Sequence, residues 1–215
     1  MARWWLHFVV VVLCLQAPMF AQAQTDWPTI VKPAIKQVVR IEMLRQGDGK
    51  PGVCSGVVTH KENGFVITAA HCVDVPKSES LSVTVNKRHA EVVKVNALLD
   101  LAVLKTDLRD EQQMPLADQT PPIGTEVAVV GHAFGDAKLI VQFGRIAQVL
   151  NDESNMVLIN ADVIGGDSGG AILDAHGRLV GITSRVYYNG PMHLGAAVRI
   201  EDVREFAEPY IWRAK

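Results

Sequence analysis

A serine flanked by glycines is the best candidate nucleophile in this sequence. Ser168 lies in the run GDSGG at residues 166–170, where a sharp turn would expose its hydroxyl. A hydroxyl attacks only if a base removes its proton. His71, in TAAHC at 68–72, could be that base, and Asp100, in LLDLAVL at 98–104, could orient the imidazole. Each residue alone has an ordinary structural explanation, but together they indicate nucleophilic hydrolysis.

In the order His, Asp, Ser, these motifs resemble those of the chymotrypsin/trypsin superfamily of serine proteases, over residues 38–210. The resemblance implies that Ser168 attacks a peptide carbonyl, His71 moves the proton, and Asp100 holds the imidazole tautomer. It also implies an oxyanion hole formed by the backbone N–H groups of Gly166 and Ser168. The expected activity is that of a serine endopeptidase that needs no cofactor and acts on peptides or proteins. The alternative is a protein of the same fold that binds peptides or misfolded chains with little turnover.

The run GDSGG also fits the G-x-S-x-G turn of α/β-hydrolases. Those enzymes place the acid and the histidine after the serine. Here the best acid and histidine precede Ser168, and too few residues follow it to complete that fold. The sequence therefore favours the trypsin-like interpretation.

Three residues are candidates for substrate binding, and the resemblance leaves their roles open. Asp162, six residues before Ser168, stands where trypsin has the buried acid that selects Arg or Lys, although it could equally be a surface turn residue. In GITSRV at 181–186, Ser184 matches a residue whose backbone binds substrate, and Val186 replaces a glycine that keeps the pocket deep. A trypsin-like pocket and a narrower one for small side chains are both consistent with this pattern.

The cysteines indicate a disulfide. Of the three in the chain, Cys14 falls in a predicted signal peptide, which leaves Cys54 and Cys72. Two cysteines in an exported protein are most simply a bridge, and the trypsin family has a matching one beside its histidine. A metal site on His71 and Cys72 is the alternative, but no further ligands stand at suitable spacing, so no metal is expected.

The first 23 residues predict a secretory signal peptide. They combine Arg3, an eight-residue apolar core at 8–15 and the cleavage pattern AQA at 21–23. The apolar core is shorter than the roughly 18 residues that span a membrane, and Leu13 fits a lipoprotein signal at Cys14 poorly. We therefore expect export to the periplasm or the medium, without stable membrane insertion after cleavage.

Residues 24–36, with Pro28 and Pro33, predict an extended arm or a short pro-like segment. In animal trypsins a newly formed amino terminus pairs with the aspartate before the nucleophile. The run TIVK at 29–32 offers no such terminus, so the partner of Asp167 stays open. An enzyme that folds in its active form, or that is activated differently, is expected.

The rest of the chain predicts an all-β fold. Short apolar runs at 37–43, 53–59, 64–69, 81–85, 91–95 and 101–105 are separated by turn residues. Seven more follow at 126–131, 139–143, 144–150, 156–160, 171–173, 179–185 and 193–198. With the resemblance, they predict two six-stranded antiparallel β-barrels of the chymotrypsin type, at 37–105 and 123–199, joined by a connector at 106–122. A C-terminal helix is expected at 200–215, because Ile200, Val203 and Phe206 recur at helical spacing.

Bulk charge does not select a partner. The formal net charge is −2, and charged residues make up 20% of the chain. No basic run argues for nucleic acid or for a membrane surface. The sequence gives no indication of the oligomeric state.

Overall fold

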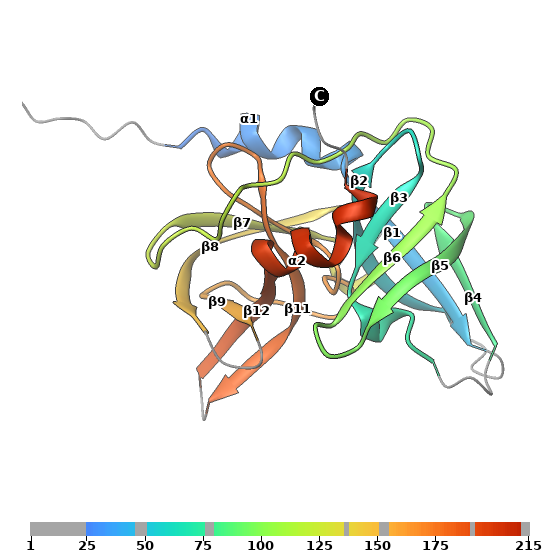
Figure 1. The fold of residues 1–215 in the computed structure, drawn as a ribbon. Coiled ribbons are helices and arrows are strands. Elements are labelled where there is room, and N and C mark those ends of the chain that lie inside the picture. Colours follow the sequence, from blue (N-terminus) through green and yellow to red (C-terminus); the bar gives the residue numbers. More distant parts are fainter. Residues whose placement is uncertain are drawn as a thin grey trace, which may run out of the picture.

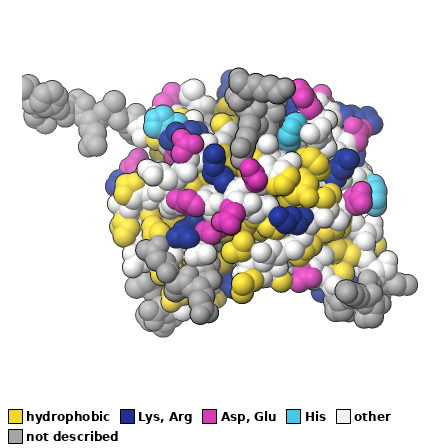
Figure 2. All heavy atoms as spheres, in the orientation of Figure 1, with side chains coloured by type: hydrophobic (Ala, Val, Ile, Leu, Met, Phe, Trp, Pro, Cys, Tyr) yellow, Lys and Arg dark blue, Asp and Glu magenta, His cyan; other side chains and the backbone are white. Residues whose placement is uncertain are grey.

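The structure, a computed structural model, describes residues 25–45, 51–75, 80–135, 138–150, 155–189 and 192–211. The signal peptide predicted at 1–23 lies outside these residues. Among the helices of the described ranges, none is both long and apolar enough to cross a membrane. Figure 2 shows acidic and basic side chains interspersed over one face, in keeping with the small net charge.

Two closed antiparallel barrels of six strands form the molecule (Figure 1), which confirms the predicted fold class. The first has the strand order β1-β2-β3-β6-β5-β4 and the second β10-β11-β12-β9-β8-β7. The strands of the first barrel are β1 (Val38–Arg45), β2 (Gly52–His60), β3 (Phe65–Thr68), β4 (Leu81–Val85), β5 (Arg88–Asn96) and β6 (Leu101–Thr106). Those of the second are β7 (Glu126–Gly131), β8 (Ile140–Val149), β9 (Met156–Ile159), β10 (Ala171–Leu173), β11 (Leu179–Asn189) and β12 (Met192–Arg199).

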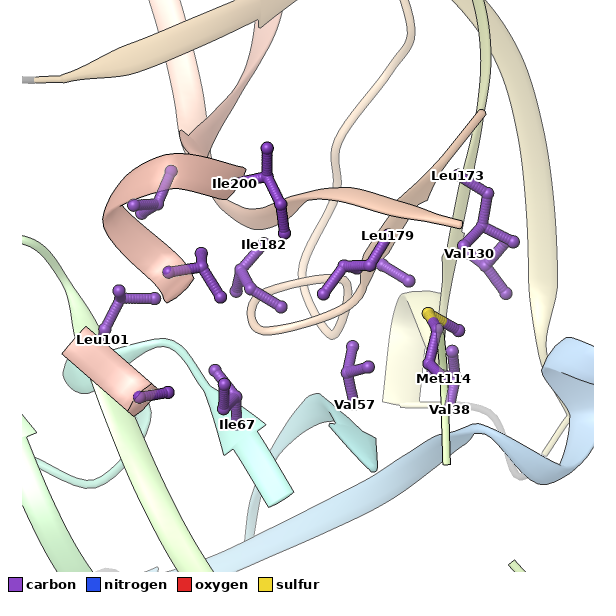
Figure 3. Close-up of a cluster of buried hydrophobic side chains, with 14 of the residues drawn as sticks. Val38, Val57, Ile67, Leu101, Met114, Val130, Leu173, Leu179, Ile182 and Ile200 are labelled. Carbon is purple, nitrogen blue, oxygen red and sulfur yellow. The ribbon is translucent and has the colours of Figure 1, made fainter. Parts of the chain in front are cut away.

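A continuous apolar core joins the two barrels (Figure 3). It contains Val57 and Leu101 from the first barrel, Leu179 and Ile182 from the second, and Met114 from the connector. Separate clusters fill each barrel interior. This joint core fixes how the barrels face each other, and with them the groups that line the cleft.

Strand β6 is buried on both faces, which explains its unbroken apolar run. Leu101 and Val103 pack into the core between the barrels, whereas Ala102 and Leu104 point into the interior of the first barrel. Successive side chains on a strand alternate between faces, so both sets must be apolar here. Asp100 is therefore held at the start of a firmly packed strand.

The C-terminal segment packs as predicted. Helix α2 (Ile200–Ala207) buries Ile200, Val203 and Phe206 against the core, and the 3₁₀ turn η4 (Glu208–Tyr210) follows. Burying a side chain such as Phe206 contributes about 2–3 kcal/mol. Residues 212–215 of the predicted helix lie outside the described residues.

The N-terminal arm is helical, not extended as predicted. Helix α1 (Trp27–Val31) begins at Asp26, whose carboxylate accepts a hydrogen bond from Thr29 N at 3.4 Å, and the 3₁₀ helix η1 (Lys32–Lys36) continues it. Each proline lies in the first turn of its helix, where no backbone N–H is required. Prolines at those positions start a helix instead of preventing one.

Strand β8 is a single strand, whereas the sequence predicted two strands that meet at Gly144. An added Cβ at Gly144 would lie 2.9 Å from the Ala161 side chain and 3.1 Å from the Asn160 carbonyl oxygen. Gly144 therefore marks a close approach of chain segments inside one strand, not a turn between two.

Candidate active site

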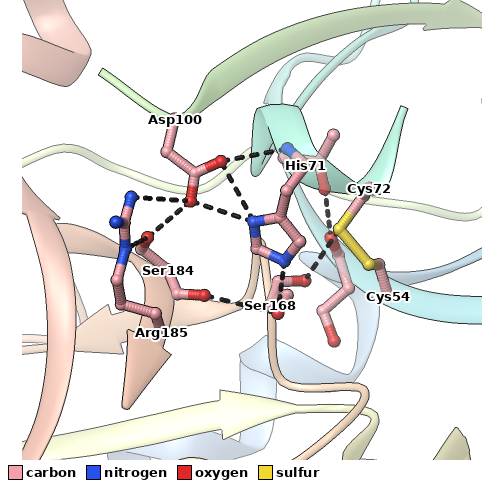
Figure 4. A network of polar contacts seen from close by, with 9 residues as sticks. Cys54, His71, Cys72, Asp100, Ser168, Ser184 and Arg185 are labelled. Carbon is pink, nitrogen blue, oxygen red and sulfur yellow. Dashed lines mark hydrogen bonds and ion pairs between the residues drawn. A yellow bond between two sulfur atoms is a disulfide. The ribbon is translucent and has the colours of Figure 1, made fainter. Parts of the chain in front are cut away.

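The three residues predicted to act together converge on one line of contacts (Figure 4). His71 Nε2 lies 2.9 Å from Ser168 Oγ, and His71 Nδ1 lies 3.0 Å from each carboxylate oxygen of Asp100. They line a cleft of about 760 Å³ with groups from both barrels. An alcohol, an imidazole and a carboxylate in this order allow proton transfer away from the alcohol.

His71 is placed by the 3₁₀ turn η2 (Ala70–Cys72), which follows β3. Its backbone N–H donates to Asp100 Oδ1 at 3.0 Å, so the carboxylate holds both the main chain and the ring of the histidine. Asp100 has a left-handed backbone, with φ of 56°, a conformation that aspartate adopts more readily than most residues. This strained conformation lies directly before β6, at the point where the carboxylate must turn toward the ring.

The Asp100 carboxylate is buried but well supplied with donors. Burial alone would raise its pKa, but hydrogen bonds from the His71 ring, the Ser184 hydroxyl and the His71 backbone outweigh burial and hold the pKa below its usual value. Asp100 is therefore ionised at neutral pH, which suits a group that accepts from Nδ1–H.

The backbone of the turn that carries Ser168 is held by a hydrogen bond from the loop before β8. The Gly165 carbonyl oxygen accepts from Phe134 N at 2.6 Å, and a planar trans peptide directs the next N–H, that of Gly166, the opposite way. Gly166 has φ of 101°, and a Cβ there would lie 2.2 Å from the His132 carbonyl oxygen. Only glycine fits this position. This is consistent with the prediction that the backbone N–H of Gly166 acts beside that of Ser168.

A residue that sequence reasoning missed holds this turn from the first barrel. Ser55, fully buried on β2, donates through Oγ to the Gly166 carbonyl at 2.8 Å and through its backbone N–H to the Ser168 carbonyl at 2.8 Å. His132 N donates to the same hydroxyl at 2.8 Å. Nothing in the run VCSGVV marks this serine, because its role depends on strands that meet only in the folded chain.

Amide groups donate hydrogen bonds to Asp167, whereas in trypsin a newly formed amino terminus pairs with the aspartate at this position. Ile164 N donates to Oδ2 at 3.1 Å, and Gln142 Nε2 lies 3.4 Å from the same oxygen. No lysine or arginine in the described parts of the chain pairs with this carboxylate, which is 1% exposed. Burial therefore raises its pKa to about 6, although the Ile164 hydrogen bond acts in the other direction.

The candidate substrate-binding residues line two adjoining hollows. Val186 and Ser184 line the main cleft beside Val163 and Ile164. Asp162 is exposed, as in the surface-turn alternative, and lines a smaller hollow of about 160 Å³ that shares Val163, Ile164 and Val186 with the main cleft. The main cleft is lined by apolar side chains on this side of Ser168.

Cys54 and Cys72 form a disulfide, as predicted. Their sulfurs lie close to His71, but both are used in the bridge and are not available as thiolate ligands for a metal. The bridge ties β2 to the turn that carries His71, and thus supports both this base and the neighbouring Ser55.

Comparison with known proteins agrees with the two-barrel fold. A trypsin-like peptidase domain is matched over residues 54–182, more than half of the chain. The chain is 25% identical over 172 residues to the periplasmic pH-dependent serine endoprotease DegQ of Escherichia coli, covering 74% of this chain and 37% of that protein. It is 30% identical over 172 residues to the magnetosome formation protease MamE of Magnetospirillum gryphiswaldense, covering 71% of this chain and 22% of that protein.

A solved structure gives the same result for the fold. The serine endoprotease from Yersinia pestis matches with a TM-score of 0.72 at 25% identity, over 88% of this chain and 68% of that one. The chain spans well under half the length of the two curated relatives named above. By its domain match and its two-barrel fold, the chain belongs to the trypsin-like peptidase family.

Proposed function

We propose that the chain is an exported serine endopeptidase that hydrolyses peptide bonds through an acyl-enzyme intermediate. The observation that carries the proposal is the position of the His71 ring, with Nε2 2.9 Å from Ser168 Oγ and Nδ1 3.0 Å from the buried Asp100 carboxylate. Hydrogen-bond reach on both sides is what a base that relays a proton requires.

In the proposed mechanism, Ser168 Oγ attacks the substrate carbonyl as His71 Nε2 accepts the hydroxyl proton. His71 then gives that proton to the leaving amine, and a water molecule repeats the sequence to release the acyl group. Asp100 accepts from Nδ1–H throughout, which fixes the tautomer and stabilises the imidazolium.

The N–H groups of Gly166 and Ser168 are proposed to bind the negative oxygen of the tetrahedral intermediate. Each such donor contributes about 3–4 kcal/mol to transition-state stabilisation. The hydrogen bond from Phe134 N to the Gly165 carbonyl supports this role, because it turns the Gly166 N–H away from Phe134.

For the residue whose carbonyl is attacked, we propose a small or medium apolar side chain. Val163, Ile164 and Val186 line the cleft beside Ser168, and the exposed Asp162 lines only the smaller adjoining hollow that shares these three residues. Asp162 is exposed to solvent, which weakens its attraction for a Lys or Arg side chain, so the apolar residues of the cleft favour an apolar substrate side chain over a trypsin-like preference.

The proposed location is the periplasm. The apolar segment and cleavage pattern at residues 1–23 support export, and the Cys54–Cys72 disulfide suits an oxidising compartment. The named relative from Escherichia coli is itself described as periplasmic.

Peptide-library cleavage read by mass spectrometry tests the proposal. The purified protein should cleave after apolar residues, and the Ser168→Ala variant should lose turnover by about 10⁶-fold while keeping its fold. Peptide binding without cleavage by the wild-type protein would instead favour the binding protein of little turnover.

A further inference from the structure

Arg185 is a cleft residue that the mechanism above does not use. It lies on β11 directly after Ser184, and its side chain is 57% exposed where it lines the cleft. Its Nε donates to Ser184 Oγ at 3.1 Å, and its Nη2 lies 3.7 Å from Asp100 Oδ2. In Figure 4 the guanidinium and the His71 ring approach the carboxylate from opposite sides.

The contact with Asp100 does not occupy all the hydrogen-bond donors of the Arg185 guanidinium. Asp100 already accepts from His71 N, His71 Nδ1 and the Ser184 hydroxyl, so Arg185 has only the longer approach to Oδ2. A guanidinium carries five N–H donors. Donors on the exposed side of Arg185 therefore remain for an acceptor that enters the cleft.

The open edge of β11 indicates which part of a substrate Arg185 meets. Strand β10 pairs with β11 only up to Ile182, and Thr183 bonds to the backbone of Gly169 and Gly170. From Ser184 onward, within the described residues, β11 pairs only with β12. An extended peptide can add to that edge, and every other pair in this barrel is antiparallel.

Antiparallel addition sets the register. Ser168 Oγ lies 3.4 Å from the Ser184 carbonyl oxygen, so the substrate residue whose carbonyl is attacked lies beside Ser184. The preceding substrate residue, called P2, then lies opposite Arg185. Opposed residues in an antiparallel pair direct their side chains to the same face.

We propose that Arg185 selects substrates with an acidic side chain at P2. The inference rests on the proposed peptidase function and adds a second determinant to the apolar pocket beside Ser168. A carboxylate at P2 would form a charge-assisted hydrogen bond with the guanidinium, whereas a lysine there would be repelled.

The same contact affects the chemical step. Among the residues that the structure describes, the charged side chains that line the cleft with His71 are those of Asp74, Asp100 and Arg185. The positive charge of Arg185 beside Asp100 opposes formation of the His71 imidazolium. A P2 carboxylate neutralises that charge, so part of its benefit appears in kcat and not only in KM.

Peptide anilides that share Val at the attacked position and carry Glu, Gln or Lys at P2 test the proposal. The wild-type protein should show kcat/KM about 5- to 10-fold higher for Glu than for Gln, and lower still for Lys. Arg185→Gln should make Glu and Gln equivalent and move the acid limb of the pH profile to higher pH. Arg185→Glu should reverse the preference toward Lys. Arg145→Gln is the matched control, because Arg145 is also 57% exposed and paired with an acid, Glu126, but does not line the cleft.

Binding to the Ser168→Ala variant separates this proposal from the peptidase function. Fluorescein-labelled versions of the three peptides should bind in the order Glu, Gln, Lys by anisotropy, and Arg185→Gln in that background should abolish the order. Cleavage without any P2 preference overturns the arginine assignment and leaves the peptidase intact. Binding in the order Glu, Gln, Lys without any cleavage by the wild-type protein supports the arginine assignment and overturns the peptidase function. Equal binding of the three peptides without cleavage overturns both proposals.

Discussion

The Ser55 hydroxyl lies 2.8 Å from the carbonyl oxygen of Gly166, so a side chain of the first barrel holds the turn of the second that carries the proposed nucleophile. The backbone N–H of Ser55 holds the Ser168 carbonyl as well. The two barrels are thus connected at the turn whose N–H groups are proposed to bind the substrate oxygen.

Ser55→Ala should reduce kcat by about 10- to 100-fold with little change in KM. It leaves the Gly166 carbonyl without its donor, which loosens the peptide groups of the turn that act only in the transition state. An unpaired buried carbonyl also costs about 1–3 kcal/mol of stability. Steady-state kinetics and thermal unfolding measure both effects.

Thr106→Val is the control for that experiment. Thr106 Oγ1 donates to the His89 carbonyl at 2.8 Å in the same barrel, and Thr106 does not line the cleft. It should lose less stability than Ser55→Ala, because His89 is exposed and water can replace the lost donor, with kcat unchanged. Equal losses of kcat in the two variants would reduce Ser55 to a general structural role.

Asp167→Asn should stabilise the protein above pH 6. Burial raises the pKa of Asp167 to about 6, so the folded state binds more protons than the unfolded state between about pH 4 and 6. The contribution of this residue to stability therefore falls as pH rises through that window. Asparagine removes the buried charge and can still accept from Ile164 N.

Urea unfolding of both proteins at pH 4 and pH 8 measures this difference. From pH 4 to pH 8, the free energy of unfolding of the variant should rise by up to about 3 kcal/mol relative to that of the wild type. Glu111 gives the opposite pH trend in stability, because hydrogen bonds that outweigh its burial lower its pKa to about 2. Subtracting the free energy of unfolding of the wild type from that of the variant at each pH cancels this contribution. A variant that is less stable than the wild type at pH 8 would contradict the account.

Loss of the Cys54–Cys72 disulfide should destabilise the fold by about 3 kcal/mol. The two cysteines are separated by 18 positions, and a bridge that closes such a loop restricts the unfolded chain. Denaturant unfolding with and without a reducing agent measures the loss, with the Cys54→Ala/Cys72→Ala double variant as the control, since it should not respond to the reductant. Unchanged stability on reduction would show that the bridge adds nothing.

Val186→Gly should broaden the pocket beside Ser168. Val186 lines the cleft together with Val163 and Ile164, and removing its side chain leaves more room for the attacked residue. The ratio of kcat/KM for Phe over Val at that position should rise about 10-fold, measured with matched anilides. An unchanged ratio would place Val186 outside the pocket that holds this side chain.

Much of the fold was predictable because it depends on local patterns. Alternating apolar runs gave the strands, and the GDSGG, TAAHC and DLAVL motifs carried the family resemblance. The errors came from tertiary context. In the sequence Gly144 resembles a turn residue, but in the fold it lies close to Ala161 inside one strand. Pro28 and Pro33 lie in the first turns of two helices, where a proline is tolerated.

The groups that support the site could not be predicted in the same way. Ser55 lies 111 positions before Gly166 and Arg185 lies 85 positions after Asp100 in the chain (185 minus 100), and no spacing rule connects such positions. Counting from Ser168 left two alternatives for Asp162, a pocket acid and a surface turn residue, and the folded chain exposes Asp162 at a hollow that adjoins the cleft.

Fluorophosphonate labelling followed by intact-mass and peptide mapping tests the central claim most directly. The reagent modifies a serine hydroxyl only where a neighbouring base activates it. The folded wild-type protein should gain one label, on Ser168, and the His71→Ala variant should label far more slowly. A folded protein that is not labelled at Ser168, or that is labelled equally fast without His71, would contradict the proposed site.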